Sequence, residues 1–103
     1  MRGRDNGRER DPLVRPEGFE LGQMLMTPGV QEQVPPSEML RAVRRHARGD
    51  WGELDAEDRS ANDAALKHGG RLLSSYRTEA GVKFWIITEA DRSATTVLLP
   101  DEY

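Results

Sequence analysis

His46 is the residue of this 103-residue chain whose type is best suited to acid–base chemistry. It lies among the arginines of the segment SEMLRAVRRHAR, and a histidine beside cations could act as a general base on a phosphate ester. With Arg92 and either Tyr76 or Thr88 around the expected sheet, His46 defines the hypothesis of a small metal-independent ribonuclease. The alternative is that His46 lies on a solvated helix face and does no chemistry.

A polar turn between two apolar strands is the second candidate site. Its residues Glu89, Asp91, Arg92 and Ser93 stand in the segment ITEADRSATT. Binding residues are concentrated on loops that a rigid scaffold holds, so this turn is a predicted binding site. The alternative reading is geometric, because Asp91 could form an Asx-turn and Arg92 could pair with a neighbouring carboxylate.

Four arginines on one predicted helix form the third candidate site. Arg41, Arg44, Arg45 and Arg48 stand against Glu38 alone between Ser37 and Arg48, a local balance of 4 − 1 = +3. These cations could contact nucleic-acid phosphates. The net charge of the whole chain is −3, which argues against general affinity for nucleic acid.

Composition argues against several other classes of site. The chain has no cysteine and 2 histidines, so we expect no metal site and no cofactor. The segment from Asp50 to Asp63 contains 6 acidic residues, but it lacks the spacing of an EF-hand, and helix capping explains it better than calcium or mimicry of a phosphate backbone. No apolar run is long enough for a membrane helix, so we predict a cytoplasmic protein without membrane contact.

Cap signals predict the helices. Thr27 followed by Pro28 begins a short helix to about Gln33, and Ser37 is the expected cap of a second helix that ends before Gly49. Asp55, with Asp58 three residues later, predicts a third helix that ends at Gly69. Trp51, in the loop between the last two helices, is expected in the core.

An alternation of period two begins at Arg71 and predicts strands. RLLSSYRT and VKFWIITEA form a hairpin, TTVLLP adds a strand, and FELGQMLM permits a short edge strand. Trp85, Ile87 and the final strand are expected to help form the core. The predicted fold class is α+β, with two or three N-terminal helices packed on an antiparallel three- or four-stranded β-meander. Residues 1–18, rich in arginine and poor in apolar side chains, are predicted to be a disordered tail, and residues 19–103 a single domain.

Three segments carry a resemblance to known proteins: RHARGDWGEL (45–54), ANDAALKHGGRLLSSY (61–76) and FWIITEADRSATTVLLPDEY (84–103). Residues 19–103 resemble a group of small plasmid-related proteins that bacterial plasmids, integrative elements and prophages encode. The resemblance implies a mobile-element setting and carries over no catalytic residue.

Three functional hypotheses follow. The first is a non-catalytic accessory protein of a mobile element that binds a host or element macromolecule, which we expect to be a protein, and modulates restriction or another defence system. The second is the ribonuclease, which shares with barnase-like and RelE-like toxins only a broad analogy of fold. The third is a regulator that binds nucleic acid through the helix from Arg41 to Arg48. The oligomeric state does not follow from the sequence.

Overall fold

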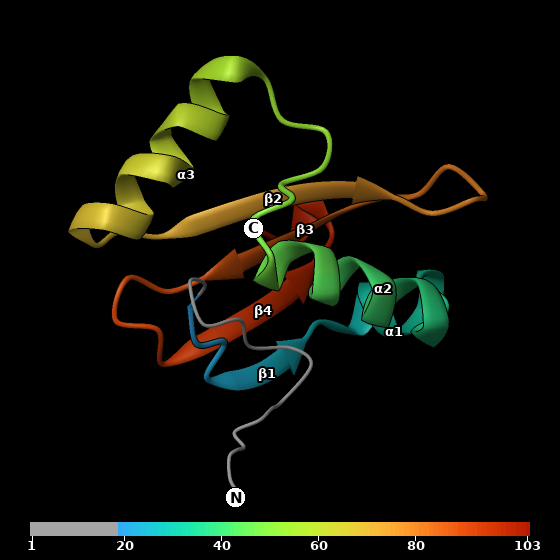
Figure 1. Ribbon diagram of the computed structural model, residues 1–103. Helices are drawn as coiled ribbons and strands as arrows, with labels where there is room; N and C mark the ends of the chain where they lie inside the picture. The colour runs from blue at the N-terminus through green and yellow to red at the C-terminus, as the bar shows by residue number, and fades with distance from the viewer. Residues whose placement is uncertain (1–18) are drawn as a thin grey trace, which may run out of the picture.

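Within residues 19–103, four strands form one mixed sheet in the order β1-β4-β3-β2, with three helices around it (Figure 1). The computed structural model describes residues 19–103, and the predicted tail of residues 1–18 lies outside them. The predicted α+β class is confirmed. In chain order the elements are β1 (Gln23–Met26), α1 (Pro28–Gln33), α2 (Pro36–Ala47), α3 (Ala56–His68), β2 (Leu72–Arg77), β3 (Lys83–Thr88), β4 (Ala94–Leu98) and the 3-10 helix η1 (Pro100–Glu102).

The sheet departs from the predicted meander at one edge. Strands β2, β3 and β4 are antiparallel neighbours, as short connections require, but β1 pairs with β4 in parallel. No short turn joins these two strands, because all three helices and the hairpin lie between them in the chain. Their relative direction therefore depends on packing of distant segments, which the local pattern does not encode.

The predicted cap residues are confirmed for two helices and wrong for the third. Thr27 caps α1 by accepting from the N–H of Val30, and Asp55 caps α3 by accepting from the N–H of Asp58. Helix α2 begins at Pro36 after Pro35, without a side-chain cap, so Ser37 lies inside its first turn. Proline is favourable at that first position because its fixed φ suits the helix and no N–H is required there.

The core lies between helix α2 and one face of the sheet. Ala42, Val43 and Ala47 of α2 share a buried cluster with Phe84 and Ile86 of β3. The register of the strands assigns Trp85 and Ile87 to the opposite face, together with their partners Leu98 and Thr96 on β4. The expectation that Trp85 helps form the core is therefore wrong, because it is only half-buried and lies outside the cluster. Ile87 is buried as expected, with an exposed fraction of 6%, although it lies on this opposite face, and Val97 of the final strand belongs to the cluster. Trp51 is buried in the core as predicted.

The outer edge of β2 is closed by backbone mimicry. The Asn62 side chain, from α3, donates to the carbonyl of Leu73 at 2.7 Å and accepts from its N–H at 3.1 Å, as a neighbouring strand would. Ser75 is bonded to the backbone of Trp51 and Glu53, on either side of Gly52. A Cβ at Gly52 would lie 2.1 Å from the carbonyl oxygen of Ser75, so only glycine permits this approach. This edge offers no free ladder groups at Leu73 and Ser75.

Candidate functional site

The predicted general base, His46, is a core residue. Its exposed fraction is 0%, and Phe19 and Trp51 lie against its ring with centroids 5.4 and 5.6 Å away. The expectation of a solvated position is wrong because α2 turns Ala42, Val43, His46 and Ala47 inward and leaves the arginines outside. That spacing of small and apolar residues around His46 was the signal in the sequence that could have identified it as buried.

A chain of hydrogen bonds determines which nitrogen of the His46 ring carries the proton. The hydroxyl of Thr95 donates to the carbonyl of Leu21 at 2.6 Å, so it must accept from the hydroxyl of Thr88 at 2.7 Å. Thr88 then has only its lone pairs for Nε2 of His46 at 2.8 Å, and Nε2 must carry the proton. The remaining nitrogen, Nδ1, faces the hydroxyl of Ser74 at 2.5 Å and accepts from it.

The pKa of His46 follows from this environment. Burial disfavours the imidazolium, and the positive charge of Arg92 acts in the same direction, so the pKa falls from 6.5 to about 3. At neutral pH the ring is neutral and both nitrogens are used internally. A general base must reach a substrate proton, and His46 in this position has no nitrogen directed to solvent.

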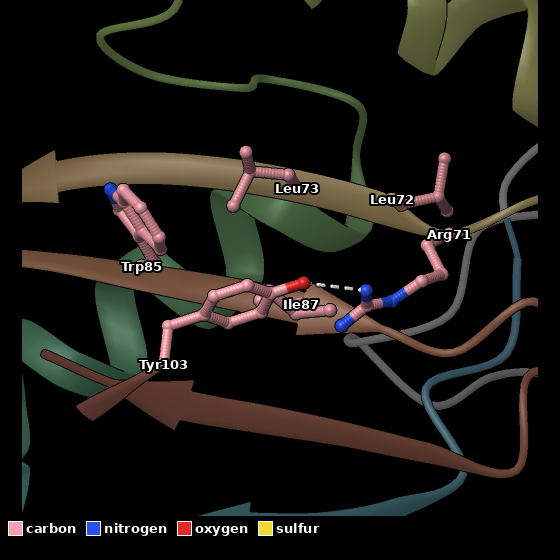
Figure 2. Close-up of a pocket in the computed structure, with 6 residues that line it drawn as sticks. All are labelled: Arg71, Leu72, Leu73, Trp85, Ile87 and Tyr103. Carbon is pink, nitrogen blue, oxygen red and sulfur yellow. Dashed lines mark hydrogen bonds between the residues drawn. The ribbon is translucent and has the colours of Figure 1, made fainter. Parts of the chain in front are cut away.

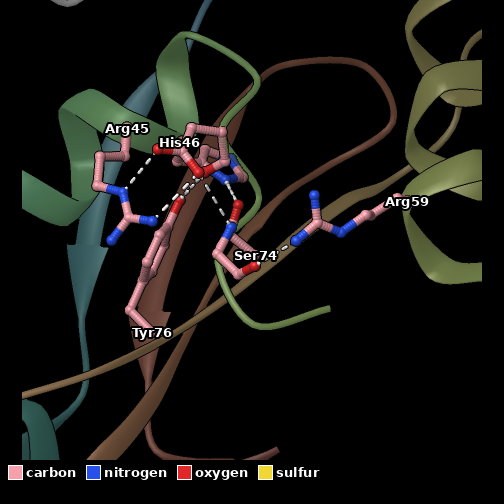
Figure 3. Close-up of polar contacts among 7 residues, drawn as sticks. Arg45, His46, Arg59, Ser74 and Tyr76 are labelled. Carbon is pink, nitrogen blue, oxygen red and sulfur yellow. Dashed lines mark hydrogen bonds and ion pairs between the residues drawn. The ribbon is translucent and has the colours of Figure 1, made fainter. Parts of the chain in front are cut away.

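Tyr76 and Arg45 form a second internal network (Figure 3). The Tyr76 hydroxyl donates to the carbonyl of Asp50 at 2.6 Å, and burial raises the pKa of this phenol. Arg45 binds the Asp50 carboxylate at 2.8 and 3.2 Å and lies over the Tyr76 ring. The hydrogen bond from Arg45 lowers the pKa of Asp50. Arg45, at the C-terminal end of α2, is therefore already paired with groups of the same chain.

Arg92 organises the polar turn from its interior. Its guanidinium donates to four carbonyl groups, at 2.6 Å from Gly70, 3.1 Å from both Glu89 and Ala90, and 3.2 Å from Ala65. The last of these carbonyls belongs to α3, whose C-terminal end carries negative partial charge. Arg92 has a φ of +62°, which is rare for a residue other than glycine. The guanidinium thus ties the turn to the end of α3.

The other turn residues also have internal partners. Asp91 accepts from the N–H of Ser93 at 3.0 Å, which is the Asx-turn of the geometric reading, and hydrogen bonds from Ser93 lower the pKa of Asp91. The Glu89 carboxylate lies 3.5 Å from Arg71, not beside Arg92. Of the four residues of the ribonuclease hypothesis, the structure brings together only His46 and Thr88, in the buried chain. Tyr76 and Arg92 lie in separate networks.

Three of the four predicted binding arginines share an exposed face of α2. Arg41, Arg44 and Arg48 are exposed, and within residues 19–103 none of them forms an ion pair. They border a shallow hollow of about 420 Å³ together with Ser37 and Leu40, whose side chain is 42% exposed. We refer to Arg41, Arg44 and Arg48 as the arginine face. Its spacing follows directly from the helical period that the sequence predicts.

A second hollow, of about 300 Å³, lies over the sheet face that faces away from α2 (Figure 2). We call it the aromatic hollow. Its lining residues are Arg71, Leu72, Leu73, Trp85, Ile87 and Tyr103. The sequence reasoning missed it, since the alternation of β3 is apolar on both faces and does not show which one the helices cover.

Tyr103 closes one side of the aromatic hollow. Its ring lies edge-on to Trp85 with centroids 6.0 Å apart, and its hydroxyl accepts from Arg71 at 2.7 Å. The preceding residue holds it there, because the Glu102 carboxylate accepts from the hydroxyl of Thr27 at 2.5 Å and from the N–H of Gly29 at 2.9 Å. These bonds lower the pKa of Glu102 and anchor the segment to the start of α1. Tyr103 itself remains 69% exposed.

The aromatic hollow combines an apolar floor with a cation at one end. Arg71 lies over the Tyr103 ring at 5.5 Å, and its hydrogen bond to the phenol raises the pKa of the guanidinium. Trp, Tyr and Arg are the residue types that dominate binding energy at protein interfaces. A volume near 300 Å³ is at the lower limit of small-molecule sites, so this hollow fits an inserted side chain better than a cofactor.

Residues 19–103 contain no group of three or more potential metal-ligating side chains. In the same part of the chain, none of the helices combines the length and the apolar content needed to cross a membrane. Comparisons with protein-family models, with curated proteins and with solved structures find no match to this chain.

Proposed function

We propose that this protein is a non-catalytic accessory protein of a mobile element, which binds a protein partner through the aromatic hollow. The observation that carries the proposal is the grouping of Arg71, Trp85 and Tyr103 around an apolar floor on the sheet face opposite the one that α2 covers. An apolar side chain of a partner inserted there would remove Trp85 and Tyr103 from water and contact Arg71 at the rim.

The internal use of the candidate catalytic groups supports the binding hypothesis over the ribonuclease. His46 is neutral and enclosed, and the N–H groups of Arg92 donate to backbone carbonyls. The setting in a mobile element rests on the resemblance of residues 19–103 to plasmid-related proteins. The proposal includes action in the cytoplasm, where a modulator of restriction or another defence system would meet its target.

Substitution at the hollow tests this function. The tagged full chain is used to isolate a stoichiometric partner from a native-type host after nuclease treatment, and the partner is then purified for titration calorimetry. Tyr103→Ala is expected to weaken binding at least tenfold, since truncation at an interface hot spot costs about 2 kcal/mol or more. The exposed Tyr103 is a suitable site because its loss should leave the core intact.

Leu66→Ala provides the matched control, because Leu66 is an exposed apolar residue on α3 outside the lining of the hollow. This variant should bind as the wild type does. The proposal would be contradicted if no protein stayed bound to the tagged chain after nuclease treatment, or if Tyr103→Ala bound the partner with the affinity of the wild type. A change in phage or plasmid restriction on expression of the wild type, lost in Tyr103→Ala, would connect the binding to defence.

The arginine face supports a second candidate function, contact with nucleic acid. Arg41, Arg44 and Arg48 together could neutralise three phosphates, and the logarithm of the affinity for duplex DNA would then fall with the logarithm of the salt concentration with a slope of about −2.7. The triple variant Arg41→Gln/Arg44→Gln/Arg48→Gln is expected to lose this slope in fluorescence anisotropy titrations. Lys67→Gln/Lys83→Gln, which removes charge elsewhere on the surface, should retain it; equal slopes in both variants would exclude the arginine face.

A further inference from the structure

Within residues 19–103, strand β1 is an open edge of the sheet. Its described partner is β4 alone, and the N–H groups of Gln23 and Thr27 donate to the carbonyls of Ser93 and Val97 at 3.0 and 3.1 Å. Backbone groups of alternate residues in a strand point to the same side. Gln23, Leu25 and Thr27 therefore direct their N–H groups toward β4, and Met24 and Met26 present their N–H and C=O groups on the outer side.

The side chains of this edge are apolar and exposed. The exposed fractions are 42% for Met24, 42% for Leu25 and 47% for Met26. Proteins commonly protect an open edge with a charged residue, a proline or a bulge, and Gln23–Met26 contains neither charge nor proline and pairs with β4 in an unbroken register. The opposite edge of the same sheet, at β2, is closed by Asn62 and by the segment around Gly52.

We infer that a second copy of this chain pairs with β1 in antiparallel orientation about a two-fold axis at Leu25. In this register, Met24 of each copy lies opposite Met26 of the other, and all four outward backbone groups of each strand are bonded across the axis. A register centred on Met26 would place Met24 opposite Pro28, which has no N–H. A register centred on Met24 would place Met26 opposite Gly22, whose φ of +66° is not that of a strand.

A groove of the same chain complements this strand. Met26 borders an apolar groove of about 290 Å³, whose other lining residues are Val30, Gln31, Val34, Pro36 and Met39. Met24 and Met26 share the sheet face of Thr95 and Val97, the face that the helices cover. The Met24 side chain of the second copy, opposite Met26, would therefore lie at this groove, and the flexible thioether suits an irregular apolar space.

The occupant is a second copy because both halves of the contact are present in one chain. The strand supplies the apolar side chain, the groove receives it, and no charge on Gln23–Met26 opposes itself across the axis. Pairing of a four-residue strand buries less than the about 800 Å² per partner of a typical stable interface. The dimer is accordingly expected to form in a concentration-dependent equilibrium.

Disulfide trapping tests the register directly. The chain has no cysteine, so Leu25→Cys introduces one thiol per molecule. Leu25 faces its own counterpart in a non-hydrogen-bonded pair, with Cα atoms about 4.5 Å apart, a separation that a disulfide can span. Under mild oxidation the full-length Leu25→Cys variant is expected to become mostly a covalent dimer. Leu66→Cys, at an exposed site on α3, should cross-link at least tenfold more slowly.

A mixed pair of variants distinguishes the proposed register from random collision. Met24→Cys and Met26→Cys are each expected to cross-link poorly alone, and to form the heterodimer when mixed. Sedimentation velocity should show a wild-type dimer that dissociates on dilution, and a monomer for Leu25→Lys, which places two cations across the axis. Leu66→Lys should dimerise as the wild type does. A monomeric wild type at millimolar concentration, with Leu25→Cys no more reactive than Leu66→Cys, would overturn the proposal.

Discussion

The free energy of unfolding is expected to fall by on the order of 4 kcal/mol as the pH is lowered from 6.5 toward 3, through His46 alone. The pKa of His46 is about 3 in the folded chain, because burial and Arg92 disfavour its charged form, and 6.5 is its ordinary value. Between these two values the unfolded chain binds a proton that the folded chain does not. The contribution is complete above pH 6.5 and is lost as the pH falls, at up to about 1.4 kcal/mol per pH unit.

Urea denaturation at several pH values measures this effect, and His46→Gln isolates it. Glutamine has an amide that can donate and accept, but it does not titrate, so the variant should be less stable than the wild type at pH 7 by about 1–3 kcal/mol. Between pH 6.5 and 4.5 its stability should change less than that of the wild type, by about 2–3 kcal/mol. His68→Gln, at an exposed position at the end of α3, should follow the wild-type curve. Parallel curves for the wild type and His46→Gln would show that His46 titrates normally.

Arg92→Ala is expected to destabilise the protein by about 3 kcal/mol. The substitution leaves four carbonyl groups without their charged donor, including that of Ala65 near the end of α3. Hydrogen bonds to charged groups contribute about 1.5–3 kcal/mol each, but solvent can replace part of this set because Arg92 is only partly buried. The measurement is equilibrium unfolding in urea at pH 7, where His46 is neutral in both variants.

Two further variants separate the guanidinium from the backbone conformation of Arg92. Arg92→Gly loses the same donors but tolerates a positive φ, so it should be more stable than Arg92→Ala by about 1 kcal/mol. Arg77→Ala removes an exposed arginine that pairs with Glu53 at 3.3 Å, and such surface pairs contribute at most about 1 kcal/mol. If Arg92→Ala unfolded at the same urea concentration as Arg77→Ala, the inference that Arg92 organises the turn would be contradicted.

The local features of the fold could be predicted because short-range chemistry determines them. Thr27 and Asp55 are cap residues whose side chains accept from N–H groups three residues later, and both helices begin where those residues predict. The period of two after Arg71 likewise gave the hairpin and the last strand. The parallel pairing of β1 with β4 could not be predicted in this way, since it depends on contacts between residues about 70 positions apart.

The candidate sites were less predictable because side-chain type does not reveal environment. His46 looked reactive in the sequence. In the structure it belongs to a buried network that three hydroxyl residues complete, and these residues, Ser74, Thr88 and Thr95, are distant from it in the chain. Arg92 and Asp91 were correctly placed in a turn, but two of the four carbonyl partners of Arg92, those of Ala65 and Gly70, come from α3 and from the residues before β2. Prediction of the aromatic hollow would have required knowledge of which sheet face α2 covers.

The difference between the two edges of the sheet limits how large an assembly can become. Growth of a β-sheet into a filament requires each added molecule to expose a new edge like the one that it has just covered. Here the amide of Asn62 already occupies the ladder position beside Leu73, so a molecule that joins through β1 offers no equivalent edge on its far side. Addition through β1 therefore ends at two molecules. The exposed apolar strand, which would otherwise favour amyloid growth, then supports a dimer and not a filament.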